Sequence, residues 1–284
     1  MKTDKNHYRC KKIFDTHVHI GGGNLGFDMT EDMVVTMLDR YNVDHILLSN
    51  CDCCEVDFDQ KILPDKLQIT QSDGLERTLK LARLYPDRIS VAPFIKASTE
   101  GLTRDYRKLI EDNLDIIKAI KIHPYHGDIS PVDKRVIPYL ELAEEHNLCV
   151  VSHTGGCEKA SPVHVYEAAK MFKNVNFVMV HMGLGTDNKE ALDLLGKCDN
   201  LYGDTTWVPM STTIEAIKRY GSKKMMFGSD APIDGTDTYL HNRTNDRSIY
   251  QDYFYVLPDL ISENDYDDLM YKNAERVFKL RIEE

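Results

Sequence analysis

Strand-like and helix-like segments alternate along the whole of this 284-residue chain, and no other feature narrows the choice of fold as far. Runs rich in β-branched residues recur at intervals of roughly 25 to 45 residues. They cover residues 13–20, 45–50, 89–95, 116–123, 148–153, 176–181, 201–206 and 224–230. Eight such units without a break in composition predict a closed α/β barrel of the (β/α)8 type, formed as a single domain over residues 1–284.

The segments between these runs carry helix signals. Thr30 stands before an apolar stripe with helical spacing, and Ser130-Pro131 and Ser161-Pro162 each place an N-cap residue before a proline. A final helix is predicted at about residues 263–280, packed against the barrel. No glycine-rich G-x-G-x-x-G follows the first run, which argues against an open dinucleotide-binding sheet.

The composition limits which kinds of molecule the protein is expected to bind. The net charge of −11 argues against nucleic-acid binding, and no apolar run approaches the roughly 18 residues of a membrane span. The opening residues Met1 to Lys5 lead into no apolar signal segment, and the seven cysteines lack scaffold-like spacing. We therefore expect a cytoplasmic protein with a small-molecule substrate and reduced thiols, and its state as monomer or homo-oligomer is left open.

Two histidines lie close together in the first run. Because side chains two residues apart in a strand point to the same face, His17 and His19 project side by side. Two neutral imidazoles fixed in this way can share one divalent cation. The pair alone is equally compatible with two strand histidines that bind no metal.

Polar side chains also end the later runs. The carboxyl ends of five predicted strands carry His17 and His19, Lys121 and His123, His153, His181, and Asp230. In a closed barrel these ends converge on the face that holds the active site. Core histidines alone would not distribute in this way, so we expect these residues to form one site.

This set of residues suits metal-assisted hydrolysis. A catalytic zinc takes three or more protein ligands and leaves a position for a water whose pKa falls towards neutrality. His17, His19 and His153 would supply three nitrogens. Asp230 would bind the metal or take a proton from the water as general base. The simpler alternative for Asp230 is a capping residue before Pro232.

The ordered motifs resemble a known family. They are DTHVH (15–19), KIHP (121–124), SHTG (152–155), VHMG (180–183), FGSD (227–230) and NAERVF (273–278). Together they are similar to the amidohydrolase superfamily, within it the amidohydrolase-related (family 2) branch, over nearly the whole chain. The resemblance implies a distorted TIM barrel that binds a divalent metal, commonly zinc, through His17, His19, His153 and Asp230.

The resemblance leaves the number of metal ions open. In relatives with two metals, a lysine of strand 4 is carboxylated to bridge the ions, and a histidine of strand 6 binds the second ion. In relatives with one metal, that histidine polarises the substrate or shuttles protons. Lys121 and His181 occupy these two positions.

Four further residues are candidates for substrate contact. His123 shares a strand face with Lys121, and His126 lies in the loop just beyond; His123 has an equal claim to a structural role. Arg243, in the long loop after the last strand, would bind a substrate carboxylate or remain a surface arginine. Trp207 is either a pocket wall or a packing residue.

Three cysteines, Cys51, Cys53 and Cys54, follow the second strand run at the predicted rim of the site. For these thiols we favour a place in a loop near the pocket over metal binding, and we note that such thiols are open to oxidation.

These inferences favour a metal-dependent hydrolase that cleaves an amide, lactone or related C–N or C–O bond of a small molecule. In this interpretation the metal and His181 polarise the carbonyl, and Asp230 accepts and then delivers the proton. The alternative is a metal-dependent non-oxidative decarboxylase (carboxy-lyase) of the same branch. A more remote alternative is a barrel that binds metal or ligand without turnover. Some decarboxylase relatives carry Glu-x-His where this chain has His-x-His, which favours hydrolysis.

Overall fold

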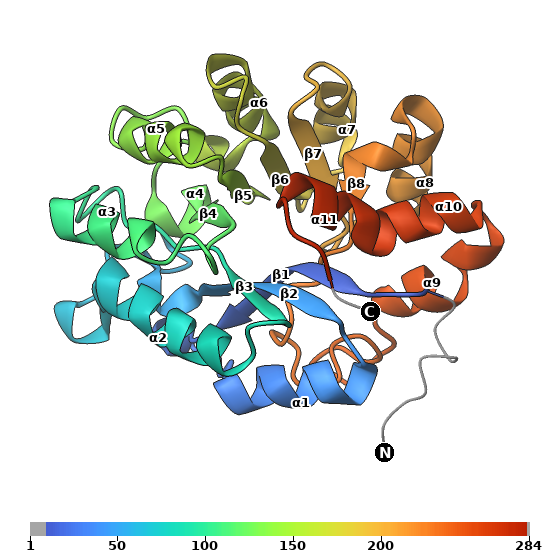
Figure 1. Ribbon diagram of the computed structural model, residues 1–284, viewed down its shortest axis with the longest axis horizontal. Coiled ribbons are helices and arrows are strands. Elements are labelled where there is room, and N and C mark those ends of the chain that lie inside the picture. The colour runs from blue at the N-terminus through green and yellow to red at the C-terminus, as the bar shows by residue number, and fades with distance from the viewer. Residues whose placement is uncertain (1–9, 283–284) are drawn as a thin grey trace.

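The computed structural model describes residues 10–282, so the opening residues Met1 to Lys5 lie outside it. Eight parallel strands form the centre of the molecule, and helices surround them (Figure 1). The strands are β1 (Phe14–Ile20), β2 (His45–Asn50), β3 (Ile89–Val91), β4 (Ala119–Ile122), β5 (Cys149–Gly155), β6 (Phe177–Leu184), β7 (Leu201–Asp204) and β8 (Met225–Met226).

One α-helix follows each strand except β4, which is followed by two, and β8, which is followed by three. They are α1 (Glu31–Tyr41), α2 (Gln71–Leu84), α3 (Arg104–Glu111), α4 (Pro124–Gly127), α5 (Ile137–Glu145), α6 (Pro162–Met171), α7 (Lys189–Leu195), α8 (Met210–Tyr220), α9 (Tyr250–Tyr255), α10 (Glu263–Asp267) and α11 (Asn273–Val277). A π-helix, Asp268–Lys272, connects the last two. Over residues 10–282 no helix combines the length and the apolar character needed to cross a bilayer.

Hydrogen bonding closes the strands into a barrel. Strands β1 to β3 pair in one parallel sheet and β4 to β8 in another. Isolated parallel bridges join the two sheets at Val91–Ile117 and Phe94–Lys121 and complete the ring at Val18–Ala231. The predicted fold class, a distorted (β/α)8 TIM barrel, is therefore confirmed.

The C-terminal helix covers the amino-terminal end of the barrel. Val277 and Phe278 belong to the same buried cluster as Phe14 and Ala119, the first residues of β1 and β4. The rings of Phe14 and Phe278 lie 5.8 Å apart. In Figure 1 the segment α10 to α11 lies across this end. The predicted packing of a final helix on the barrel is confirmed, and the opposite, carboxyl end remains available for a site.

Several predicted boundaries need correction. The helix expected after Ser130-Pro131 begins only at Ile137, because the Asp133 N–H donates to the Ser130 carbonyl (3.0 Å) and closes a turn instead. The predicted helix 263–280 is divided by the π-helix and ends at Val277, shortly before the left-handed Lys279 (φ 54°). The helix starts expected after Thr30 and Ser161 are confirmed.

One buried histidine outside the site, His45, should contribute to the pH dependence of stability. The His45 ring donates from Nδ1 to the Asp87 carbonyl (3.0 Å) and accepts at Nε2 from the Ser90 hydroxyl (2.9 Å). Burial lowers the pKa of His45 from 6.5 to about 4. Because the unfolded chain then takes up the proton first, the stabilisation is complete above pH 6.5 and is lost as the pH falls towards 4.

We expect the free energy of unfolding to fall by about 2 kcal/mol more between pH 7.5 and pH 5 in the native chain than in His45→Gln. Urea unfolding at the two pH values measures this difference. Leu260→Ala, which removes an exposed apolar side chain and no titratable group, is the control and should retain the native slope. Equal slopes in the native chain and His45→Gln would contradict the assignment.

Candidate active site

A cavity of about 380 Å³ opens among the carboxyl ends of the strands. Its lining includes seven of the candidate ligand and substrate residues that the sequence singled out, namely His17, His19, His123, His126, His153, His181 and Asp230. The rest of the lining is mainly apolar and comes from the loops and from the last residue of β6, with Leu25, Phe27, Met29, Phe58, Leu184 and Ile233 among its members. Histidines from four strand ends therefore meet in one cavity, as predicted.

His17, His19 and Asp230 form a buried cluster at this cavity. The two Nε2 atoms lie 2.8 Å apart. Asp230 Oδ1 lies 3.1 Å from Nε2 of His19 and 3.7 Å from Nε2 of His17. Burial alone would raise the pKa of Asp230, but the facing His17 and His19 hold that pKa well below its ordinary value. The carboxylate is therefore ionised beside two ring nitrogens.

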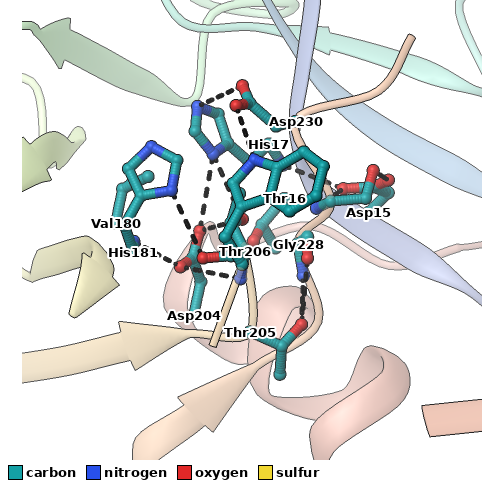
Figure 2. Close-up of polar contacts among 12 residues, drawn as sticks. Asp15, Thr16, His17, Val180, His181, Asp204, Thr205, Thr206, Gly228 and Asp230 are labelled. Atoms are coloured by element: carbon teal, nitrogen blue, oxygen red, sulfur yellow. Dashed lines mark hydrogen bonds and ion pairs between the residues drawn. The ribbon is translucent and has the colours of Figure 1, made fainter. Parts of the chain in front are cut away.

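A chain of hydrogen bonds fixes the proton of His17 (Figure 2). The Thr206 hydroxyl donates to Asp204 Oδ2 (2.7 Å), so its oxygen is free to accept from His17 Nδ1 (3.2 Å). With its proton on Nδ1, the imidazole presents an unprotonated Nε2 to His19 and Asp230. His17 is thus held in the tautomer that a metal ligand requires.

Asp15 brings strands β1 and β8 together, a role that the sequence analysis did not assign. Its Oδ1 accepts from the backbone N–H groups of His17 and Ser229 (3.1 Å each), and its Oδ2 accepts from the hydroxyls of Tyr239 (2.7 Å) and Ser229. Burial raises the pKa of Asp15 to about 7. These bonds hold His17 beside the residue that follows Ser229, which is Asp230.

Asp204, at the end of β7, plays a matching part and was also missed. It accepts from the backbone N–H groups of His181 (2.9 Å) and Thr206 (3.2 Å), besides the Thr206 hydroxyl (Figure 2). Burial raises the pKa of Asp204 to about 6. The signal that could have found it was present, because this aspartate lies near the carboxyl end of the predicted run 201–206, as Asp230 lies at the end of the run 224–230.

Three residues of the site have left-handed backbones that are uncommon for residues other than glycine. They are His181 (φ 67°), Trp207 (φ 56°) and Asp230 (φ 67°). Such conformations cost of order 1–3 kcal/mol each and persist only where surrounding contacts hold them. Here the hydrogen bonds of Asp204 to His181 and of Trp207 to Asp230 are among those contacts.

Lys121 and two further histidines surround the cluster. Lys121 Nζ lies 2.8 Å from His17 Nε2, and burial lowers the pKa of this amine. The His153 ring stacks on His123 (centroids 4.1 Å apart) and lies 4.7 Å from the His181 ring. His181 Nδ1 donates to the Thr206 carbonyl (3.3 Å), so its Nε2 is unprotonated, and burial lowers the pKa of His181 to about 4.

Two of the four candidates for substrate contact do not line the cavity. The Trp207 indole instead donates from Nε1 to Asp230 Oδ2 (3.0 Å). Arg243 donates from Nε to the Ile233 carbonyl (2.8 Å), and its guanidinium lies over the Phe27 ring at 4.7 Å. His123 and His126 do line the cavity. Substrate contact by any of the four stays a prediction.

The cysteine loop lies where the sequence placed it. Cys51 and Cys54 line the cavity, whereas Cys53 is buried away from it. A hydrogen bond from the Cys54 thiol and the nearby His19 lower the pKa of Cys51 to about 6. Burial raises the pKa of Cys53 beyond its ordinary value.

The donor set of the cluster fits a divalent cation. Two imidazole nitrogens and one carboxylate oxygen lie within 4.8 Å of one another, and the hydroxyl of Thr206 directs the lone pair of His17 towards the others. Nitrogen and carboxylate ligands of this kind suit zinc, manganese and related ions. The geometry thus supports a divalent metal without selecting which one.

Comparison of whole folds finds similar solved structures. A 5-carboxyvanillate decarboxylase from Novosphingobium aromaticivorans, solved with manganese and a nitrobenzoic acid, is 12% identical, with a TM-score of 0.70 and coverage of 99% of this chain and 100% of the other. A probable 2-pyrone-4,6-dicarboxylic acid hydrolase from Acinetobacter baumannii, solved with citric acid, is 13% identical, with a TM-score of 0.63 and coverage of 95% and 100%.

A dihydroorotase from Campylobacter jejuni is 16% identical, with a TM-score of 0.60 and coverage of 97% of this chain and 85% of the other. At such identities the likeness shows the fold alone. No sequence match to a curated protein was found.

The family assignment comes from the sequence itself. The model of the family described as amidohydrolase matches residues 80–280, which is more than half of the chain. The match includes the ends of strands β4 to β8, where Lys121, His153, His181 and Asp230 lie, and the barrel and its metal-compatible cluster agree with it. The chain belongs to the amidohydrolase family.

Proposed function

We propose that this protein is a metal-dependent hydrolase that cleaves an amide, lactone or related C–N or C–O bond of a small molecule. The observation that carries the proposal is the convergence of His17 Nε2, His19 Nε2 and Asp230 Oδ1 at one cavity. A divalent cation bound there would act as Lewis acid and make a water more acidic. His153 would complete the ligand set of this ion. Lys121 and His181 would provide ligands for a second ion.

In this proposal Asp230 is the general base. Its Oδ2 accepts from the Trp207 indole, which fixes the orientation of the carboxylate, while Oδ1 faces the two histidines. The facing imidazoles keep this carboxylate ionised, so it can take a proton from water and return it to the leaving group. The unprotonated Nε2 of His181 suits a ligand of a second ion or a proton acceptor.

A decarboxylase is the second candidate, because several of the similar structures are decarboxylases. One acts on 5-carboxyvanillate and another was solved with 2,6-dihydroxybenzoate, so both fit aromatic acids into a barrel of this shape. Release of carbon dioxide from such acids would separate the two reactions.

For the hydrolase we also propose zinc as the metal, the cytoplasm as the location and one domain over residues 1–284, on the sequence arguments alone.

Metal content is the first test of the proposal. We expect protein purified without added metal to contain at least one equivalent of a divalent metal per chain by elemental analysis. A second equivalent that disappears in Lys121→Ala would assign a bridged pair of ions, because Lys121 Nζ lies beside His17 Nε2. A single equivalent unaffected by Lys121→Ala would assign a mononuclear site. Protein that neither contains nor takes up metal would contradict the proposal.

A further inference from the structure

We propose that the cavity selects substrates that carry an uncharged apolar ring beside the reacting carbonyl, and that it discriminates against substrates with additional carboxylates. This inference rests on the proposed function, since it concerns what the same site accepts. It depends on three features of the cavity: the composition of its walls, the placement of cationic side chains around it, and an exposed aromatic residue at its mouth.

The walls above the histidine cluster are apolar. Phe27 and Phe58 pack edge to face with their ring centroids 5.9 Å apart, and Phe58 also contacts the His126 ring at 5.0 Å. Met29, Leu25 and Ile233 continue this lining. A cavity of about 380 Å³ lies within the range of small-molecule sites, and walls of this kind favour an apolar group.

Among residues 10–282, no lysine or arginine side chain belongs to this lining, and the histidines of the cluster lie at its base. Lys121 is buried beneath the cavity with its Nζ on His17. Arg243 lies over Phe27, where Asp234 Oδ1 is 3.9 Å from its Nε. A carboxylate placed among the walls would therefore lose water without gaining a guanidinium or ammonium partner, which is unfavourable.

The mouth of the cavity exposes large apolar side chains. Phe58 is 54% exposed and Leu184 is 37% exposed, although both line the cavity. Exposed apolar side chains at the rim of a concave site are typical of a surface that a ligand covers. We therefore expect the mouth of this cavity to contact an apolar part of the substrate.

Hydroxamic acids test the inference by binding alone, because they chelate divalent metals without being turned over. Titration calorimetry on the metal-loaded protein would compare acetohydroxamic, benzohydroxamic and 4-carboxybenzohydroxamic acid. We expect the benzo compound to bind roughly tenfold or more tightly than the aceto compound, because its ring is buried in the apolar walls. The 4-carboxy compound should lose roughly tenfold relative to the benzo compound.

Two variants separate the walls from the rest of the protein. Phe58→Ala should reduce the preference for benzohydroxamic acid over acetohydroxamic acid by roughly threefold or more. Leu260→Ala removes an apolar side chain of similar exposure, 55%, that does not line the cavity, and should leave the preference unchanged. Binding of acetohydroxamic acid with no gain from the ring, or with no loss from the added carboxylate, would overturn this inference alone. Failure of all three compounds to bind would count against the metal site, and so against the proposed function as well.

Discussion

His17→Ala is expected to abolish stoichiometric metal binding and, with it, turnover. The imidazole of His17 provides one of the three converging donor atoms, and its Nε2 lies 2.8 Å from both His19 Nε2 and Lys121 Nζ. Without it, the two remaining donors hold a cation far less well. We expect metal affinity to fall at least a hundredfold, since changes to outer-shell partners alone typically cost about 10- to 100-fold. Equilibrium dialysis followed by elemental analysis measures the loss.

His126→Ala is the matched control for this prediction. His126 lines the same cavity and is buried like His17, but its Nδ1 donates to the Val56 carbonyl (2.9 Å), and it is not part of the cluster. The metal content of the His126→Ala variant should remain that of the native chain. Circular dichroism would establish that both variants are folded. A folded His17→Ala protein that retained its full complement of metal would contradict the proposed ligand set.

The regular elements of the fold could be predicted from local sequence. The run 45–50 coincides with β2, and the helix after Thr30 begins as expected, because its side chain accepts from the Met33 N–H. Where prediction failed, nearby hydrogen bonds decided the structure. Ser130 resembles an N-cap in sequence, yet its carbonyl closes a turn with Asp133. The local sequence pattern does not determine whether Ser130 caps a helix or closes a turn.

The ends of the strands were harder to predict for the same reason. The last run was expected at 224–230, but β8 spans only Met225–Met226, and the chain reaches Asp230 through bonds to distant residues. The Ser229 hydroxyl donates to Asp15, which lies 214 positions earlier. Such a contact has no local signature, although the two residues belong to the motifs that suggested the family.

The histidines of the site were predictable because barrel geometry brings every strand end to one face. Their outer partners were not. Asp204 and Thr206 lie in a predicted strand run, but only the structure shows that Thr206 links Asp204 to the His17 ring. The apolar wall was equally hidden, because Phe27 and Phe58 come from loops whose folding the hydrophobic pattern does not determine.

With metal supplied in excess, Asp230→Asn should still bind it, more weakly, through the remaining amide oxygen, yet lose turnover by about a thousandfold or more, because an amide of the same shape cannot accept the proton. Hydrolysis of dihydrocoumarin, a neutral aromatic lactone, provides the assay, with metal content measured on the same samples. Asp234→Asn is the control, since Asp234 lies in the same loop but outside the cluster and the cavity lining, and its rate should stay within about twofold of the native rate.

The pH profile distinguishes loss of a base from loss of structure. In the native chain the facing histidines hold the pKa of Asp230 well below its ordinary value, so the carboxylate is ionised at neutral pH. The residual rate of Asp230→Asn should therefore rise with hydroxide concentration, which replaces the missing base, while the native rate does not follow hydroxide. If Asp230→Asn binds metal and keeps the full native rate, the proton is accepted by another group, and the unprotonated Nε2 of His181 becomes the next candidate.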